Sequence, residues 1–212
     1  MYVPSHFAAG DAEVRALLDN HGAADLITAT DDGLLATFLP FVFDPAVGEH
    51  GALLGHVARN NDQWRRPPIG DAMVIVRGPD AYISPSWYAV KAEHGRVVPT
   101  WNYSAVQFTG RVQVHPDQEW LREAVTRLTD LHEGRRDAPW SVADAPATYV
   151  EKQLRAIIGI EMAIETVEGK AKLSQNRSEE DRAGVVRGLR AEGAAREAVM
   201  ADQMERLLEG LP

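Results

Sequence analysis

Apolar and polar residues alternate with a period of two along most of the first 115 residues, as they do in half-buried β-strands. Turn signals such as Asp31-Asp32-Gly33 and Gly78-Pro79 separate these stretches, and no long helical pattern lies between them. This spacing favours a small antiparallel barrel. Gly110, inside the longest stretch, indicates a bend or bulge. The predicted strands cover residues 23–30, 34–43, 51–57, 72–77, 81–84, 97–115 and 159–167.

The remaining segments show the 3.6-residue period of amphipathic helices. In one of them, which begins at Pro146, the pattern predicts that Tyr149, Val150, Leu154 and Ile157 are buried. Ser178 and Asp181 have the spacing of a capping box at the start of the last helix. The other predicted helices cover residues 11–21, 116–132 and 178–211. We therefore expect a mainly β domain over residues 1–177, with helices inserted at 116–157, and a helical appendage over residues 178–212.

Composition and charge narrow the class of protein. The 212 residues include no cysteine, which excludes disulfides and thiolate chemistry. Residues 1–7 do not form a signal peptide, and no apolar run approaches the roughly 20 residues of a membrane span. A cytoplasmic protein without membrane contacts is therefore predicted. The net charge of −9 works against DNA binding, which depends on Lys and Arg at phosphates, although a local basic patch could still serve.

A first polar cluster lies where a predicted strand turns into a short helix. His56 ends the strand, Arg59 and Asn60 stand at the helix entry, and Trp64 follows. Free backbone N–H groups at a helix start, together with a guanidinium, suit a phosphate. A surface turn capped by Asn60 or Asn61 would give the same pattern.

A second cluster precedes the last helix and contains Lys172, Gln175, Asn176 and Arg177. Its charges and amides suit an anion or the carbonyl-rich edge of a ligand, or they form a solvated basic loop.

The third cluster is aromatic. Five of the fifteen aromatic residues, Trp87 and Trp101 among them, fall within residues 82–103, where they are interleaved with small polar residues such as Ser86. Such a segment is either the wall of a pocket for a flat ligand or a wet hairpin that half-covers the core. Together the three clusters describe a ligand with an anionic tail, a polar edge and a flat aromatic body. Flavin mononucleotide (FMN) has all three parts.

Several catalytic and binding motifs are missing from the sequence. It has no Gly-x-Gly-x-x-Gly after a strand, no Gly-Lys-Ser/Thr loop and no Gly-x-Ser-x-Gly. Its seven histidines are scattered without metal-ligand spacing. No catalytic residue and no metal ligand is therefore predicted.

The chain resembles the PaiB-type FMN-binding negative transcriptional regulators. The matching pieces keep their order over nearly the whole chain. They are residues 1–7 (MYVPSHF), 39–41 (LPF), 55–60 (GHVARN) with 63–64 (QW), 82–88 (YISPSWY), 98–103 (VPTWNY) and 172–177 (KLSQNR).

The resemblance implies a six-stranded antiparallel Greek-key FMN-binding split barrel, as in pyridoxamine-phosphate oxidase-like proteins, with peripheral helices and a helical C-terminus. It also implies a homodimer with two flavin sites at the interface. In such a site His56, Arg59 and Asn60 would face the phosphate. Backbone groups near Thr37 and Leu39 would meet the isoalloxazine edge. Trp87 and Trp101 would come from the partner subunit. The 172–177 segment would touch FMN, a second ligand or the dimer seam.

Two classes of function fit this resemblance. One is a regulatory module in which FMN acts as a sensor or structural cofactor and the output is transcription or a partner protein. The other is a flavin-dependent oxidoreductase acting on a small molecule. Haem binding or breakdown is a further alternative, with His56 or His94 as the first ligand to test. Fold alone does not choose among them.

Overall fold

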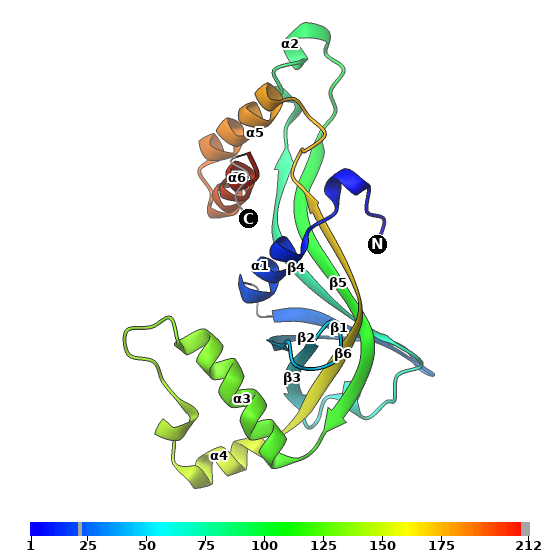
Figure 1. Ribbon diagram of the computed structural model, residues 1–212, viewed down its shortest axis with the longest axis vertical. Helices are drawn as coiled ribbons and strands as arrows, with labels where there is room; N and C mark the ends of the chain where they lie inside the picture. Colours follow the sequence, from blue (N-terminus) through cyan, green and yellow to red (C-terminus); the bar gives the residue numbers. More distant parts are fainter. Residues whose placement is uncertain (21–22, 209–212) are drawn as a thin grey trace. The chain divides into compact units, whose positions relative to one another are not determined.

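The computed structural model describes residues 1–20 and 23–208. Its six strands close into a barrel in the order β1-β2-β3-β6-β5-β4, with neighbours antiparallel wherever the register is given (Figure 1). This confirms the predicted fold class. The strands are β1 (Ala23–Thr30), β2 (Gly33–Asp44), β3 (Ala52–Ala58), β4 (Ala72–Ile83), β5 (Thr100–His115) and β6 (Ile157–Lys172).

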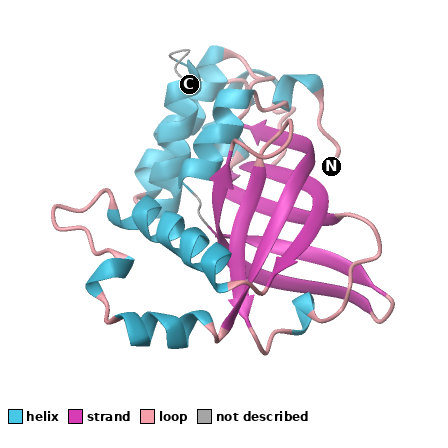
Figure 2. Cartoon of the chain, turned by 60° about the horizontal axis from the view of Figure 1, so that its bottom comes forward, coloured by secondary structure: helices cyan, strands magenta, loops and turns pink. Residues whose placement is uncertain are grey.

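Helices and 3₁₀ turns lie before β1, in the connections β3–β4, β4–β5 and β5–β6, and after β6 (Figure 2). None within residues 1–20 and 23–208 has the length and apolar content that crossing a bilayer demands. The α-helices are α1 (Asp11–Asn20), α2 (Lys91–His94), α3 (Gln118–Glu133), α4 (Ala147–Leu154), α5 (Glu179–Glu192) and α6 (Ala195–Leu208). The 3₁₀ turns are η1 (Ser5–Phe7), η2 (Asp62–Trp64), η3 (Pro85–Trp87) and η4 (Val142–Asp144).

The chain divides into two compact units that alternate along the sequence. The first, called the helical unit here, comprises residues 1–20, 77–106 and 168–212. The second, called the barrel unit, comprises residues 21–76 and 107–167. The boundary predicted between residues 177 and 178 stays a prediction.

Each unit has its own apolar core. In the barrel unit, inward-facing residues such as Leu26, Val74 and Phe108 are fully buried, and α3 and α4 share a smaller cluster around Leu121 and Leu154. In the helical unit, α5 and α6 pack on the buried side of the strands, and their core includes Ile83, Leu173, Leu189, Met200 and Met204. Burying this apolar surface is the main favourable term for each unit.

Two strands contain glycines that the chain needs for close packing. A Cβ at Gly110 would collide with the carbonyl oxygen of Ala163 on β6, so the glycine lets the two strands approach closely here. Strand β5 is continuous through this point. A Cβ at Gly78 would collide with the side chain of Leu17, and β4 likewise continues through Gly78 and Pro79. The prediction of two strands joined by a turn at 78–79 is therefore wrong, because this glycine serves packing.

The C-terminal segment also differs from the prediction. The single helix expected over 178–211 is two helices, because Gly193 adopts a left-handed φ of 72° and ends α5. Ser178 accepts a hydrogen bond from the Asp181 backbone N–H, which is one half of the predicted capping box, while the Asp181 carboxylate accepts from the Val90 N–H. The last residues of the predicted helix, 209–211, and His21 of the first one lie outside the described part of the chain.

In α4 the burial prediction is wrong for one residue. Val150 and Leu154, four residues apart, are buried, but Tyr149 is 56% exposed because it lies one position off this stripe.

Candidate functional site

The barrel unit holds the residues predicted around the phosphate and the isoalloxazine edge. We call them the barrel cluster: Thr37, Leu39, His56, Arg59, Asn60 and Trp64. Their positions follow from the connection between β3 and β4. Those strands are not neighbours, and the hydrogen bonds of Gln63 show that residues 59–71 pass β1 and β2 on the way.

A buried glutamine anchors this connection. Gln63 in η2 accepts a hydrogen bond from Thr37 Oγ1 at 2.6 Å. Its Nε2 donates to Leu26 O at 3.2 Å and to Thr28 Oγ1 at 3.1 Å. Asn61 caps η2 by accepting from the Gln63 amide at 2.8 Å, and it donates to Thr37 Oγ1. The side-chain carboxamide of Gln63 thereby ties η2 to β1 and β2.

The edge of β2 next to this turn has few strand partners. Its register with β1 runs over residues 33–40, whereas its register with β3 covers only Phe41–Asp44. Gln63 reaches the edge with a contact of 3.4 Å to Leu35 O. Leu39 itself is buried in the core.

Arg59 follows β3 and contacts the start of β6. Its Nε donates to Arg155 O at 2.6 Å and its Nη2 to Ile157 O at 3.3 Å. Among the described residues no carboxylate pairs with it, so its charge is left for a ligand or solvent. Three of its five N–H groups also remain free in these contacts. Asn60 beside it is exposed.

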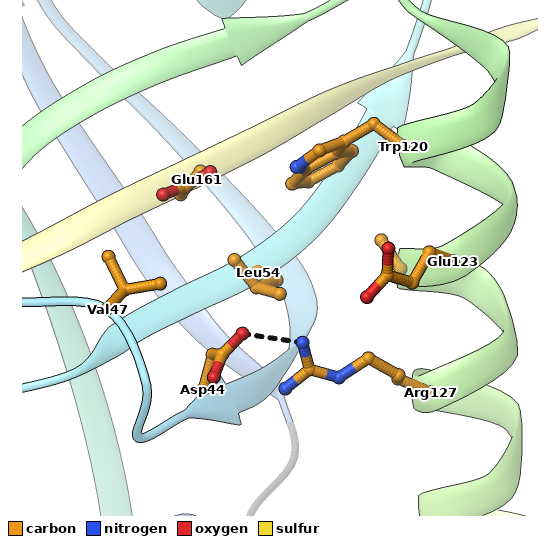
Figure 3. A pocket seen from close by; sticks show the side chains of 8 residues that line it. Asp44, Val47, Leu54, Trp120, Glu123, Arg127 and Glu161 are labelled. Atoms are coloured by element: carbon orange, nitrogen blue, oxygen red, sulfur yellow. Dashed lines mark hydrogen bonds and ion pairs between the residues drawn. The ribbon is translucent and has the colours of Figure 1, made fainter.

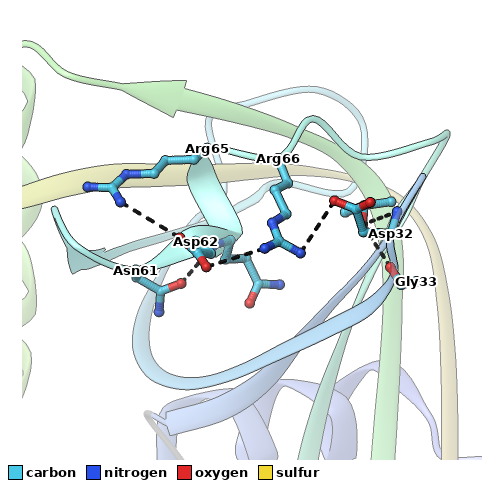
Figure 4. Close-up of polar contacts among 8 residues, drawn as sticks. Asp32, Gly33, Asn61, Asp62, Arg65 and Arg66 are labelled. Carbon is cyan, nitrogen blue, oxygen red and sulfur yellow. Dashed lines mark hydrogen bonds and ion pairs between the residues drawn. The ribbon is translucent and has the colours of Figure 1, made fainter.

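Trp64 and two arginines fix the outer side of the turn. Trp64 Nε1 donates to Arg59 O at 2.9 Å, and the Arg65 guanidinium lies 5.5 Å from the indole centroid. Arg66 lies 3.5 Å from both Asp62 and Asp32, which ties the turn to the β1–β2 hairpin (Figure 4). Such exposed ion pairs add little stability, so Gln63 is the stronger anchor.

His56 leaves the sheet on the opposite face from Thr37. Phe41 pairs with Gly55, so these two residues share a face with Thr37, and His56 is one residue further along β3. Burial lowers the pKa of His56, which favours the neutral imidazole. The structure therefore brings Thr37, Asn61 and Gln63 together, and places Arg59 against Trp64, but it separates the His56 side chain from Thr37.

The helical unit holds the other seven predicted residues, which we call the loop cluster: Ser86, Trp87, Trp101, Lys172, Gln175, Asn176 and Arg177. Lys172 donates to Thr100 Oγ1 and, at 2.9 Å, to Trp101 O. Burial lowers the pKa of Lys172, and the nearby charges of Lys170 and Arg177 add to this effect. Its hydrogen-bond partners among the described residues are uncharged, so an anion would be stabilised beside it.

The loop after Lys172 is shaped by its own side chains. Gln175 accepts from the Leu173 amide at 2.7 Å and donates to Ala171 O at 2.6 Å, so its amide serves the turn. Asn176 is exposed. The Arg177 guanidinium lies 4.7 Å from the ring centroid of Tyr88, a cation–π contact.

Two buried side chains with polar groups beside this loop, Asn102 and Tyr88, were not among the predicted site residues. Asn102 donates to Ser174 Oγ at 3.0 Å, and Ser174 has a left-handed φ of 67°, an unusual conformation for a non-glycine residue. Burial also raises the pKa of Tyr88. The Tyr88 hydroxyl lies near Arg177 and Ser174 but forms no hydrogen bond to a described residue. Asn102 lies in a motif of the resemblance, which was the available signal.

The two predicted tryptophans differ in access. Trp87 packs on α5, where a Cβ at Gly184 or Gly188 would collide with it. Trp101 is 43% exposed, and its indole N–H donates to Asp80 at 2.9 Å. Trp101 is therefore the more accessible of the two rings, and the Arg196 guanidinium lies 5.4 Å from its centroid. Ser86 accepts from the Lys91 ammonium at 3.0 Å.

Metal ligation finds no support in the described residues. Across 1–20 and 23–208, no group of three or more His, Asp or Glu side chains is arranged to hold a metal ion. His94, one of the two haem candidates, lies in the short helix α2, and its Nδ1 accepts from the Arg96 amide at 3.0 Å.

Comparison with known proteins identifies the family. Residues 1–166 match the family described as "Putative FMN-binding domain". The chain belongs to this family. It is also 33% identical to the "Protease synthase and sporulation protein PAI 2" of Bacillus subtilis (strain 168) over 211 residues, which is 99% of both chains. The predicted PaiB-type resemblance is thereby confirmed.

Solved structures confirm the split-barrel fold at low sequence identity. The FAD and heme binding protein from Mycobacterium smegmatis superposes with a TM-score of 0.58 at 19% identity, over 84% of this chain and 80% of that one. The flavocytochrome Anf3 from Azotobacter vinelandii gives 0.54 at 19% identity, over 86% and 78%.

The anchoring role of Gln63 can be tested by Gln63→Leu, which keeps the size but removes every side-chain hydrogen bond. Because Thr28 and Thr37 then lose buried partners, we expect the free energy of unfolding to fall by about 2–4 kcal/mol. Urea denaturation followed by circular dichroism measures this change. The exposed Asn60→Ala is the control, with a change within about 0.5 kcal/mol. If the two variants were equally stable, Gln63 would not be the residue that anchors the turn.

Proposed function

We propose that the protein binds FMN at the barrel cluster and acts as an FMN-dependent regulator. The observation that carries this proposal is the Arg59 guanidinium, which no described carboxylate neutralises, in a chain that belongs to an FMN-binding family. A guanidinium held in place by backbone carbonyls is pre-oriented for a phosphate, and it loses little entropy on binding.

The parts of the ligand are assigned by chemistry. Arg59 and Asn60 would hold the phosphate. The open edge of β2 near Thr37 and Leu39 would offer backbone groups to the isoalloxazine edge. Bound FMN supplies electron or hydride transfer, while the residues around it bind and orient it. The neutral His56 is a candidate for uncharged contacts only.

The loop cluster suits the same ligand class by its chemistry. Trp101 provides an exposed ring, and Lys172 and Arg177 provide cations without carboxylate partners among the described residues. Its assignment to flavin rests on the resemblance and stays a proposal.

We further propose a homodimer that uses the outer face of β1 and β2. Leu34 and Phe38 on β2 are 76% and 67% exposed, and they point away from the barrel core. In the β1–β2 register they lie opposite Ala29 and Asp25, with Ile27 between. An apolar stripe of this kind on a sheet face favours a partner surface. An isologous contact of two copies would cover it on both.

Regulation is proposed from the similarity to PAI 2, whose name refers to protease synthesis and sporulation. With a net charge of −9, contact with DNA would have to use a local basic patch, and a protein partner is the other output.

The phosphate assignment predicts a selective loss in Arg59→Ala. The preference for FMN over riboflavin should fall about tenfold or more, because the lost charge-assisted contact is to phosphate. Fluorescence titration of each flavin with the variant gives this ratio, which cancels general damage from the lost bonds to residues 155 and 157. Arg65→Ala, on the same turn, should keep the ratio. Equal weakening of both flavins in Arg59→Ala would place the phosphate elsewhere.

The dimer surface predicts that Phe38→Glu shifts the protein to monomer, because two carboxylates would be buried in a symmetric contact. Light scattering coupled to size exclusion measures the mass. Tyr149→Glu replaces another exposed aromatic residue of the barrel unit and should leave the mass unchanged. A monomeric parent protein, or a dimeric Phe38→Glu, would contradict the proposed face.

DNA as the regulatory output predicts sequence-dependent binding to the upstream region of its own gene, with an affinity that falls as salt rises. Fluorescence anisotropy at two salt concentrations, against a scrambled fragment of equal length, measures both. A flat response with both fragments would leave a protein partner as the output.

A further inference from the structure

A cavity of about 110 Å³ lies in the barrel unit, and none of its lining residues is among those assigned to flavin. Helix α3 forms one side, β3 and β6 form the floor, and the end of β2 with the following loop closes the other side (Figure 3). Its apolar surface comes from Val47, Leu54, Trp120 and Ala124, and its charged groups are Asp44, Glu123, Arg127 and Glu161.

Two of these charges neutralise each other. Arg127 Nη1 lies 2.6 Å from Asp44 Oδ2, and this hydrogen bond lowers the pKa of the Asp44 carboxyl (Figure 3). The carboxylate of Glu123 has no hydrogen-bond or ion-pair partner among the described residues. Together with Asp44 and Glu161, it gives the cavity lining three carboxylates against the one guanidinium of Arg127.

The aromatic wall is held in a fixed position. The Trp120 indole stacks on the His115 imidazole, with centroids 4.1 Å apart and planes at 3°. It also lies over Gly159, where any Cβ would collide with the ring. His115 Nε2 lies 2.8 Å from Glu161 Oε2, yet this buried nitrogen has no partner in hydrogen-bonding geometry. Glu161 is therefore positioned beside the cavity with hydrogen-bonding capacity to spare.

We propose that this cavity binds the end group of a primary alkylammonium ion. The carboxylates of Glu123 and Glu161 would accept its N–H groups, and Leu54 and Ala124 would contact its methylene carbons. The indole of Trp120 adds a surface that attracts cations. The cavity volume of about 110 Å³ is several times what one water needs, so it admits a short alkylammonium such as n-propylammonium.

Other ligand classes fit less well. An anion would face the two excess carboxylates and a guanidinium that is already paired. A metal ion would need more ligands than Glu123 and Glu161, and the described residues form no such group. A neutral alcohol would fill the same space but would leave both carboxylates without a cation.

The test is a titration of the full-length protein with n-propylammonium, 1-propanol and propionate, which share a three-carbon chain. The observable is the indole N–H signal of Trp120 in ¹H–¹⁵N spectra, identified by its loss in Trp120→Phe. We expect a saturable shift with n-propylammonium and none with the other two probes. An equal shift with 1-propanol, or no saturable shift with n-propylammonium, would overturn the proposal.

Charge-neutralising variants locate the binding. Glu161→Gln and Glu123→Gln should each weaken n-propylammonium about tenfold, as expected for losing one charge-assisted hydrogen bond. Glu151→Gln removes an exposed carboxylate from α4 in the same unit and should change nothing. Equal weakening in all three would indicate a general charge effect and contradict the site. FMN titration of the same variants should be unchanged, so this result is independent of the flavin proposal.

Discussion

The carboxamide of Gln63 lies buried where the chain leaves β3 and passes β1 and β2 to reach β4. A buried amide costs free energy unless its donors and acceptor are paired, and here threonines and carbonyls of both strands pair them. These bonds fix η2 against the barrel end. Arg59, four residues before, and Trp64, one residue after, are thereby held at a defined place, so the proposed phosphate contact depends on a residue that need not touch the ligand.

Arg59 shows how one side chain can hydrogen-bond within the fold and still keep its charge for a ligand. Its bonds to residues 155 and 157 use backbone carbonyls, which orient the guanidinium but leave its charge uncompensated. A carboxylate in the same place would have cancelled the charge that an anionic ligand needs. Surface ion pairs in the same turn, such as Arg66 with Asp62 and Asp32, have no such surplus.

Local patterns predicted most of the fold, and non-local contacts account for what they missed. Alternation and the Asp-Gly turn found β1 and β2, because both signals lie within adjacent residues. Gly78 was misread as a turn, since the side chain that requires it, Leu17, lies far away in sequence. In the site, Arg59 stood out by type, whereas Gln63 and Asn102 looked like ordinary polar residues. Their partners are up to 102 residues away, as Asn102 and Met204 are, and no periodicity encodes that pairing.

Strand β2 connects the proposed cofactor with the proposed assembly. One face carries Thr37 toward Gln63, the other exposes Leu34 and Phe38, and the edge between them has strand partners on one side only before Phe41. If two copies meet on the exposed face, a flavin at that edge would contact the interface, and linkage makes their coupling reciprocal: a flavin that binds the dimer more tightly than the monomer strengthens dimerisation by the same factor. Flavin occupancy alone could then set the fraction of dimer, which gives a regulator a response that needs no redox step.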